Sequence, residues 1–211
     1  MVRNSKEHRR DPYYKSAKQE GYRARSAFKL LEIQKRFNIF KRAFYILDLG
    51  CAPGSWLQVA KKFSEENLEK YIDQYYHRDH YKIMGVDIKK TTPIEKIKLV
   101  QEDFTKPKFI DELNAFFPEK LDLILSDASI NKSGNKFSDQ IRQINLCLKI
   151  IDLTKKNLKI NGSLVIKVFQ GTDFNNFYKK VKQEFKYIKS YKPKSSKKTS
   201  NEIYLIGLQK V

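Results

Sequence analysis

The stretch of sequence that decides the fold is Phe44-Tyr45-Ile46-Leu47-Asp48-Leu49-Gly50-Cys51-Ala52-Pro53-Gly54-Ser55-Trp56. Its apolar half predicts a buried strand, and the small residues that follow predict a turn leading into a helix. Gly50 and Gly54 let the backbone approach a ligand closely, and the helix beyond them presents free N–H groups. The alternative is an ordinary strand-to-helix turn without a ligand.

The glycine spacing separates two classes of ligand. A Gly-x-Gly-x-x-Gly loop makes room for a pyrophosphate, and its third glycine is missing here. An acid such as Asp48 before Gly-x-x-x-Gly suits a ligand with an amino acid end, such as S-adenosylmethionine. Asp87 ends the next strand-like run, where such folds hold ribose hydroxyls, and Asp103 after a third run is placed to accept from an adenine amino group. The three acids in this order favour a cofactor of this type.

Strand-like and helix-like stretches alternate along the rest of the chain. The strand-like runs are 44–49, 83–88, 99–102, 121–126, 164–169 and 203–208, and the clearest helix-like stretches are 140–158 and 174–185. Alternation of this kind predicts an α/β fold whose mainly parallel sheet is covered on both faces.

Length and patterning predict one domain with a basic arm in front of it. The chain has 211 residues, enough for one substantial core. Residues 1–40 are interpreted as a basic arm followed by a helix that Ser26 caps. Residues 41–211 form the domain, in which 65–82 are an insertion that extends the first helix and adds a surface loop.

The net charge of +19 and the pI near 9.7 indicate a polyanionic partner. Basic residues crowd both ends of the chain, with tyrosines interleaved at the first: Arg3, Lys6, Arg9, Arg10, Lys15, Lys18, Arg23 and Arg25, then Lys186, Lys189, Lys192, Lys194, Lys197 and Lys198. Cations neutralise phosphates while rings stack on bases, so we expect RNA to bind both segments. No apolar run is long enough to span a bilayer, and no membrane partner is expected. The alternative is that the excess charge only solvates the surface.

Cysteines and histidines give no sign of a disulfide framework or a metal. Cys51 and Cys147 do not form a Cys-x-x-Cys pair, which favours a reducing compartment. His77 and His80 lack a partnering cysteine or carboxylate motif, so we assign no metal.

One lysine interrupts an apolar run, Leu164-Val165-Ile166-Lys167-Val168-Phe169. A buried ammonium group costs free energy unless a partner compensates it. Two interpretations follow. Lys167 marks the solvent side of an edge strand, or it is a functional cation.

Five motifs together resemble the FtsJ/RrmJ family of S-adenosylmethionine-dependent RNA 2′-O-methyltransferases. They are Tyr22 to Leu30, Asp48 to Trp56, Ser126-Asp127, Val165 to Gly171 and Ser200 to Tyr204. The resemblance implies a Rossmann-like methyltransferase fold with a seven-stranded, mostly parallel sheet, an antiparallel last strand and helices on both faces.

The resemblance also implies a catalytic set, which falls on Lys29, Asp127, Lys167 and Glu202. The N-terminal helix then contributes a catalytic lysine. We interpret Lys167 as the base that removes the proton of the ribose hydroxyl, with Asp127 and Glu202 orienting it. The glycine turn and the resemblance together give the residues predicted to bind the methyl donor: Asp48, Gly50, Pro53, Gly54, Trp56, Asp87, Asp103 and Asp127.

The chain departs from the family after Asp127. Family members usually continue Ser-Asp with Met-Ala-Pro-Asn, whereas residues 126–131 read Ser-Asp-Ala-Ser-Ile-Asn. The shape of this substrate-side loop is therefore left open.

The predicted reaction is methyl transfer to a ribose 2′-hydroxyl of RNA, with a uridine of large-subunit ribosomal RNA as the target. The alternatives are the anticodon loop of transfer RNA, a small-molecule methyltransferase and a non-catalytic RNA-binding relative. We expect an intracellular protein, cytoplasmic or nucleolar with the mitochondrion left open. It acts as a monomer, with an accessory subunit as the alternative.

Overall fold

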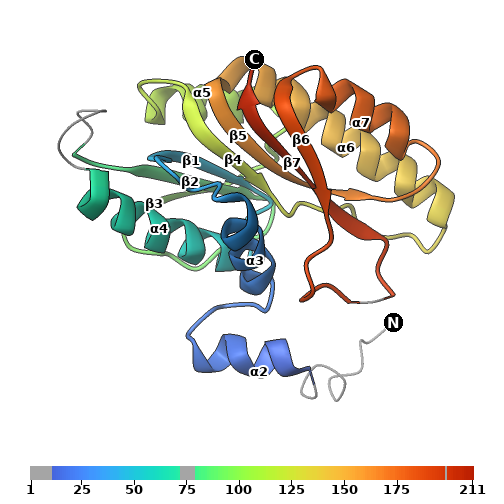
Figure 1. Ribbon diagram of the computed structural model, residues 1–211, viewed down its shortest axis with the longest axis horizontal. Helices are drawn as coiled ribbons and strands as arrows, with labels where there is room; N and C mark the ends of the chain where they lie inside the picture. The colour runs from blue at the N-terminus through green and yellow to red at the C-terminus, as the bar shows by residue number, and fades with distance from the viewer. Residues whose placement is uncertain (1–10, 72–78, 198) are drawn as a thin grey trace.

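A computed structural model describes residues 11–71, 79–197 and 199–211, which are built around a seven-stranded sheet (Figure 1). Its order is β3-β2-β1-β4-β5-β7-β6. The strands are β1 (Tyr45–Leu49), β2 (Lys82–Asp87), β3 (Ile97–Gln101), β4 (Leu121–Ser126), β5 (Leu158–Phe169), β6 (Phe185–Tyr191) and β7 (Glu202–Lys210). β7 is antiparallel to β5 and β6, and the pairs from β3 to β5 are parallel. The expected mostly parallel sheet with an antiparallel last strand is confirmed.

Helices cover both faces of the sheet, as expected. α3 (Ala27–Phe37) and α4 (Ser55–Tyr71) pack on one face. α5 (Pro107–Phe116), α6 (Lys136–Asn157) and α7 (Phe174–Lys182) pack on the other. α2 (Pro12–Gln19) lies apart from the sheet in Figure 1 and reaches α3 through a ring contact between Tyr13 and Phe28, with centroids 5.6 Å apart.

Alternation along the strands divides the core between the two faces. In β1, Ile46 packs on the α3 and α4 side, whereas Leu47 and Leu49 pack on the other side. Burial of each such side chain stabilises the fold by about 1.5 to 3 kcal/mol. A strand covered on both faces reads as continuously apolar, so a buried charge within it stands out. Asp48 in β1 and Lys167 in β5 are two such charges.

Some local expectations are wrong. The helix predicted over 174–185 ends at Lys182 and is followed by edge strand β6, whose exposed lysines and serine mask its pattern. Part of the predicted arm is helix α2, which begins at Pro12 and whose Asp11 side chain accepts from the Tyr13 N–H at 3.0 Å. Ser26 does not cap α3 with its side chain, because its Oγ lies 2.8 Å from the Oγ of Ser55.

Several predicted features fall outside the described residues. They are 72–78 of the insertion, which include His77, and the cations Arg3, Lys6, Arg9, Arg10 and Lys198. Before the gap, α4 continues to Tyr71. No helix in the described ranges combines the length and the apolar character needed to cross a membrane.

Candidate active site

Strand register places the predicted catalytic residues at one end of the sheet. Ser126 of β4 pairs with Ile166 of β5, so Asp127 follows directly beside Lys167. Lys167 in turn pairs with Tyr204 of β7. The residues lie at the end of the sheet formed by the carboxyl ends of the parallel strands, where α/β sheets bind ligands.

Lys167 is an interior cation. β5 is paired on both sides, with β4 and β7, and Lys167 is only 6% exposed. Its Nζ donates to the carbonyl oxygen of Asp127 at 2.6 Å and lies 3.2 Å from the Oδ1 of the same residue. The edge-strand interpretation is therefore wrong, and two acceptors offset the cost of burying the amino group.

Lys29 and Glu202 form the second half of the set. The Nζ of Lys29 lies 3.7 Å from Oε2 of Glu202 and donates to the hydroxyl of Tyr204 at 3.1 Å. The other carboxylate oxygen of Glu202 lies 3.4 Å from the Nζ of Lys132. In the described ranges the carboxylate of Glu202 thus forms ion pairs with Lys29 and Lys132, whereas Asp127 is the acid that contacts Lys167.

Tyr204 joins the two halves, although the sequence analysis did not single it out. Its hydroxyl donates to Oδ1 of Asp127 at 2.6 Å while it accepts from Lys29. The ring is fully buried and packs against Trp56, with centroids 5.7 Å apart. A signal was present, because residues two apart on a strand face the same side and Tyr204 is two residues after Glu202.

The network holds Asp127 ionised. Burial raises the pKa of Asp127, but the charges of Lys167 and Lys29 and the hydrogen bond from Tyr204 outweigh it, so this pKa lies below its ordinary value. Burial, reinforced by the negative charge of Asp127, raises the pKa of Tyr204 well above its ordinary value. The tyrosine therefore keeps its proton and remains a hydrogen-bond donor.

Replacing Tyr204 with Phe should lower kcat about tenfold and leave binding of the methyl donor unchanged. The ring keeps its packing, whereas Asp127 loses a donor and Lys29 loses an acceptor, and hydrogen bonds to charged groups contribute about 1.5 to 3 kcal/mol. Loss of the bond should also raise the pKa of Asp127 and move the acidic limb of the kcat profile to higher pH. Steady-state kinetics from pH 5 to 9 measure both effects, and an unaltered profile would contradict this role.

The turn between β1 and α4 requires glycine where it approaches the rest of the site. Gly50 has φ of +77°, and a Cβ there would lie 2.7 Å from the Cα of Ala128. Gly54 has φ of +104°, and Pro53 before it follows a cis peptide bond. The backbone of the turn therefore passes directly against the loop that follows β4.

Asp48 is a fully buried carboxylate for which the described ranges supply no hydrogen-bond partner. Burial raises the pKa of Asp48 well above its ordinary value, and the negative charges of Asp127 and Asp87 add to the effect. An unpaired buried acid just before a glycine turn fits a ligand that brings a positive charge to this end of β1, as the ammonium group of an amino acid does.

Asp87 and Asp103 lie at the ends of β2 and β3, as predicted. Asp87 accepts from the backbone N–H of Ala52 at 2.9 Å and of Lys89 at 2.8 Å. Asp103 accepts from the N–H of Thr105 at 2.9 Å. The bond from Ala52 ties the end of β2 to the glycine turn.

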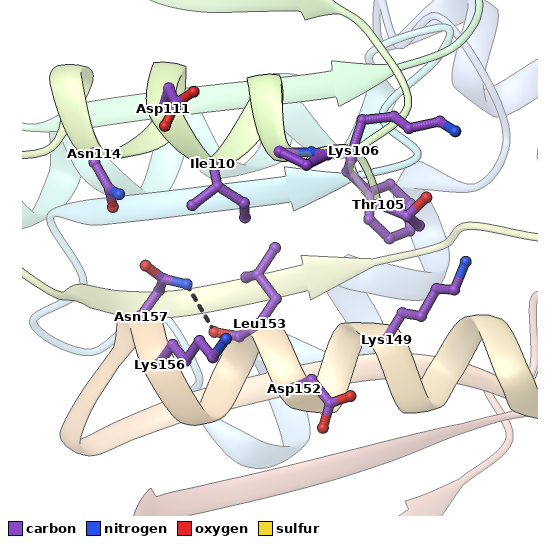
Figure 2. A pocket seen from close by; sticks show the side chains of 12 residues that line it. Thr105, Lys106, Ile110, Asp111, Asn114, Lys149, Asp152, Leu153, Lys156 and Asn157 are labelled. Carbon is purple, nitrogen blue, oxygen red and sulfur yellow. Dashed lines mark hydrogen bonds between the residues drawn. The ribbon is translucent and has the colours of Figure 1, made fainter.

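A hollow of about 560 Å³ lies between α5 and α6, and its lining includes Phe104 and Thr105, the two residues that follow Asp103 in the chain (Figure 2). Lys106 and Lys149 reach toward the end of the hollow at which Thr105 lies. Burial raises the pKa of Asp103, but the hydrogen bonds from Thr105 and the charges of these two lysines outweigh it, so the pKa lies below its ordinary value. The ionised carboxylate is suited to accept hydrogen bonds from a ligand, as its predicted role requires.

Trp56 is enclosed rather than open. It is 2% exposed, and its indole N–H donates to the carbonyl of Ser26 at 2.8 Å. Its ring packs against Tyr204 and so supports the contacts that Tyr204 makes with Asp127 and Lys29, whereas its contact with the methyl donor stays a prediction.

His80 lies among protein partners. Its ring contacts the hydroxyl of Tyr45 at 3.2 Å and the carboxylate of Asp79 at 2.7 Å. Across the described ranges, no group of three or more His, Cys, Asp or Glu side chains is arranged to hold a metal ion.

Comparison with known proteins assigns the family. The family model for FtsJ-like methyltransferase matches residues 22–210. The chain belongs to this family. Proteins named ribosomal RNA large subunit methyltransferase E are 41% identical to it in Methanosarcina acetivorans and 38% identical in Acinetobacter baumannii. The two alignments cover 94% and 96% of this chain, and 68% and 88% of those relatives.

A solved structure agrees with this family. A protein assigned as a ribosomal RNA methyltransferase from Plasmodium falciparum superposes with a TM-score of 0.76 at 30% identity, covering 90% of this chain and 98% of that one. As an FtsJ-like methyltransferase the chain is an enzyme that uses S-adenosylmethionine, so the expected family, fold, enzyme class and cofactor are confirmed.

Proposed function

We propose that this FtsJ-like methyltransferase transfers the methyl group of S-adenosylmethionine to a ribose 2′-hydroxyl of large-subunit ribosomal RNA. The observation that carries the proposal is the buried contact of Lys167 with Asp127, joined through Tyr204 to Lys29. The names of the relatives support ribosomal RNA as the substrate.

The geometry at Lys167 supports its assignment as the base. To act as the base, Lys167 must first release a proton, which leaves an amine with two N–H donors and one lone pair; Asp127 supplies two acceptors, its carbonyl and its carboxylate. Both donors are then occupied, and the lone pair is left for the proton of the ribose hydroxyl. S-adenosylmethionine supplies an electrophilic methyl group on its sulfonium. As the 2′-oxygen accepts the methyl group and S-adenosylhomocysteine leaves, Lys167 takes the hydroxyl proton and becomes an ammonium ion beside the ionised Asp127.

Not every cation of the N-terminal segment is available to RNA. Arg23 donates to the carbonyls of Thr92 at 2.6 Å and Pro93 at 2.8 Å. Arg25 pairs with Asp11 and donates to the carbonyl of Ser195 at 2.5 Å. The exposed cations that remain for RNA toward the two ends of the described chain include Lys15, Lys18, Lys186, Lys189, Lys194 and Lys197. We infer that these bind the substrate of a monomeric enzyme in a compartment that contains ribosomal RNA.

Radiolabelled methyl transfer to unmodified RNA tests the proposal. Large-subunit ribosomal RNA should accept the label, whereas transfer RNA should not. A methylated 2′-oxygen cannot attack the neighbouring phosphate, so alkaline hydrolysis should leave the label in dinucleotides. Label in mononucleotides would indicate a base methyltransferase, and label only in transfer RNA would select the anticodon-loop alternative.

A further inference from the structure

The loop after β4 carries one lysine, Lys132, beside Glu202 of the predicted catalytic set. Lys132 is half exposed, and its Nζ lies 3.4 Å from Oε1 of Glu202 and 4.8 Å from the ring centroid of Phe169. Phe169 and Glu202 are themselves paired in register at the ends of β5 and β7. Lys132 therefore lies over the strand ends that carry the catalytic residues.

The first part of this loop is fixed to α6 by a buried amide. The Oε1 of Gln143 accepts from the N–H of Ile130 at 3.1 Å, and its Nε2 donates to the carbonyls of Ala128 at 3.1 Å and Lys167 at 3.3 Å. Gln143 is fully buried. The loop that this chain builds without the usual proline is thus bonded both to α6 and, through Gln143, to the backbone at Lys167.

The second part is fixed by a buried carboxylate. Asp139 accepts from the N–H of Ser133 at 2.8 Å and of Gly134 at 3.2 Å, and Arg142 bonds both Asp139 and the carbonyl of Asn131. The backbone is thus held on both sides of residue 132. A fixed loop spends little conformational entropy when its side chain binds a ligand.

Glu202 does not depend on Lys132 alone. Its second oxygen already faces Lys29 at 3.7 Å, so the carboxylate keeps a cation if Lys132 moves away. An exposed lysine–carboxylate pair contributes little to stability, whereas a lysine that neutralises a phosphate also releases counterions. An incoming RNA strand can therefore displace Glu202 from Lys132 at small cost.

We propose that Lys132 is a phosphate-binding residue, which leaves Glu202 and binds a backbone phosphate next to the ribose that is methylated. This inference rests on the proposed function, because it takes RNA as the substrate. Lys132 thus positions the strand, and the loop adds a substrate contact that the two basic ends of the chain do not supply.

Salt dependence of RNA binding tests the inference. Lys132→Met should weaken binding of an unmodified large-subunit ribosomal RNA transcript about three- to tenfold, and reduce the slope of log affinity against log salt by about 0.7 to 0.9, the value for one phosphate. Lys132→Arg should keep the slope. The loss should appear mainly in RNA affinity, so at saturating RNA kcat should fall by a smaller factor than affinity does.

The matched control is Lys155→Met. Lys155 in α6 pairs with Glu184 at 3.1 Å, with side-chain exposures of 49% and 21%, against 50% and 21% for Lys132 and Glu202. It lies in the last turn of α6, which leads into the opposite end of β5, so its loss should leave the salt slope unchanged.

Equal slopes for the wild type and Lys132→Met would overturn the inference, as would an equal change in Lys155→Met. So would a fall in kcat without a change in RNA affinity, which would mean that Lys132 acts only on Glu202. Binding is measured without turnover, so the two failures are distinguishable. A wild type that binds the transcript but does not methylate it contradicts the proposed function and leaves the slope result valid.

Discussion

Replacing Lys167 with Met should lower kcat by about 10² to 10⁴ while leaving affinity for the methyl donor nearly unchanged. The substitution keeps an apolar stem of similar length but removes the group that takes the hydroxyl proton, and positioned acid–base groups contribute about 10² to 10⁴. The substitution also removes the two contacts that the Nζ of Lys167 makes with Asp127, at its carbonyl oxygen and at Oδ1. Single-turnover methyl transfer to RNA measures the loss, and the thermal shift produced by S-adenosylhomocysteine measures binding of the cofactor product.

A second buried lysine of the same sheet provides the matched control. Lys210 of β7 is 7% exposed and its Nζ donates to the carbonyls of Lys155 at 2.9 Å and Leu158 at 3.1 Å, at the end of the sheet away from the catalytic set. Lys210→Met should cost stability but leave kcat unchanged. Equal losses of activity in the two variants would show that the effect at Lys167 is structural, and normal turnover in Lys167→Met would refute the mechanism.

The sequence was most informative where one motif carries both strand and site. The run from Phe44 to Gly54 predicted a strand, a glycine turn and a ligand class because all three depend on neighbouring residues. Contacts across strands were harder to predict. That Asp127 lies beside Lys167 follows from the pairing of Ser126 with Ile166, which is set by packing of the whole sheet.

The role of Tyr204 also depends on contacts between distant parts of the chain, which the sequence does not show. As one more apolar position in β7 it reads as core, and it is indeed fully buried. Its role emerges only when β7 pairs antiparallel with β5 and α3 brings Lys29 to the hydroxyl. The sequence predicted that Glu202 orients Lys167, whereas in the structure Glu202 contacts Lys29 and Lys132. Residue types alone do not show which acid contacts which cation.

Replacing Asp48 with Asn should make the free protein more stable and at the same time weaken binding of the methyl donor. Asp48 is fully buried, without a hydrogen-bond partner among the described residues. Removing this charge should stabilise the fold by about 0.5 to 2 kcal/mol, the usual range for a single stabilising substitution. A ligand ammonium group would lose its counter-charge in the variant, so affinity for S-adenosylhomocysteine should fall about 10- to 100-fold.

The stability gain should grow with pH. In the unfolded chain the carboxyl has its ordinary pKa near 4, whereas burial, with the charges of Asp127 and Asp87, places the folded pKa well above that value. Between these two values the folded wild type retains a proton that the unfolded chain has released, so its stability falls as pH rises. Asn does not titrate, and the variant escapes this loss. Thermal unfolding of both proteins at pH 5 and pH 8 measures the difference.

A buried aspartate with partners tests the reasoning behind this prediction. Asp122 of β4 is 5% exposed, and its Oδ2 accepts from the N–H groups of Phe44 and Tyr45, each at 2.8 Å. Asp122→Asn should lower the melting temperature, because a satisfied carboxylate that also pairs with Lys159 is lost. If Asp48→Asn also melts lower and binds S-adenosylhomocysteine like the wild type, Asp48 is an ordinary structural acid. The melting temperature should rise in Asp48→Asn and fall in Asp122→Asn. Both residues are buried aspartates in neighbouring strands of one sheet, so the difference arises from the partners that only Asp122 has among the described residues.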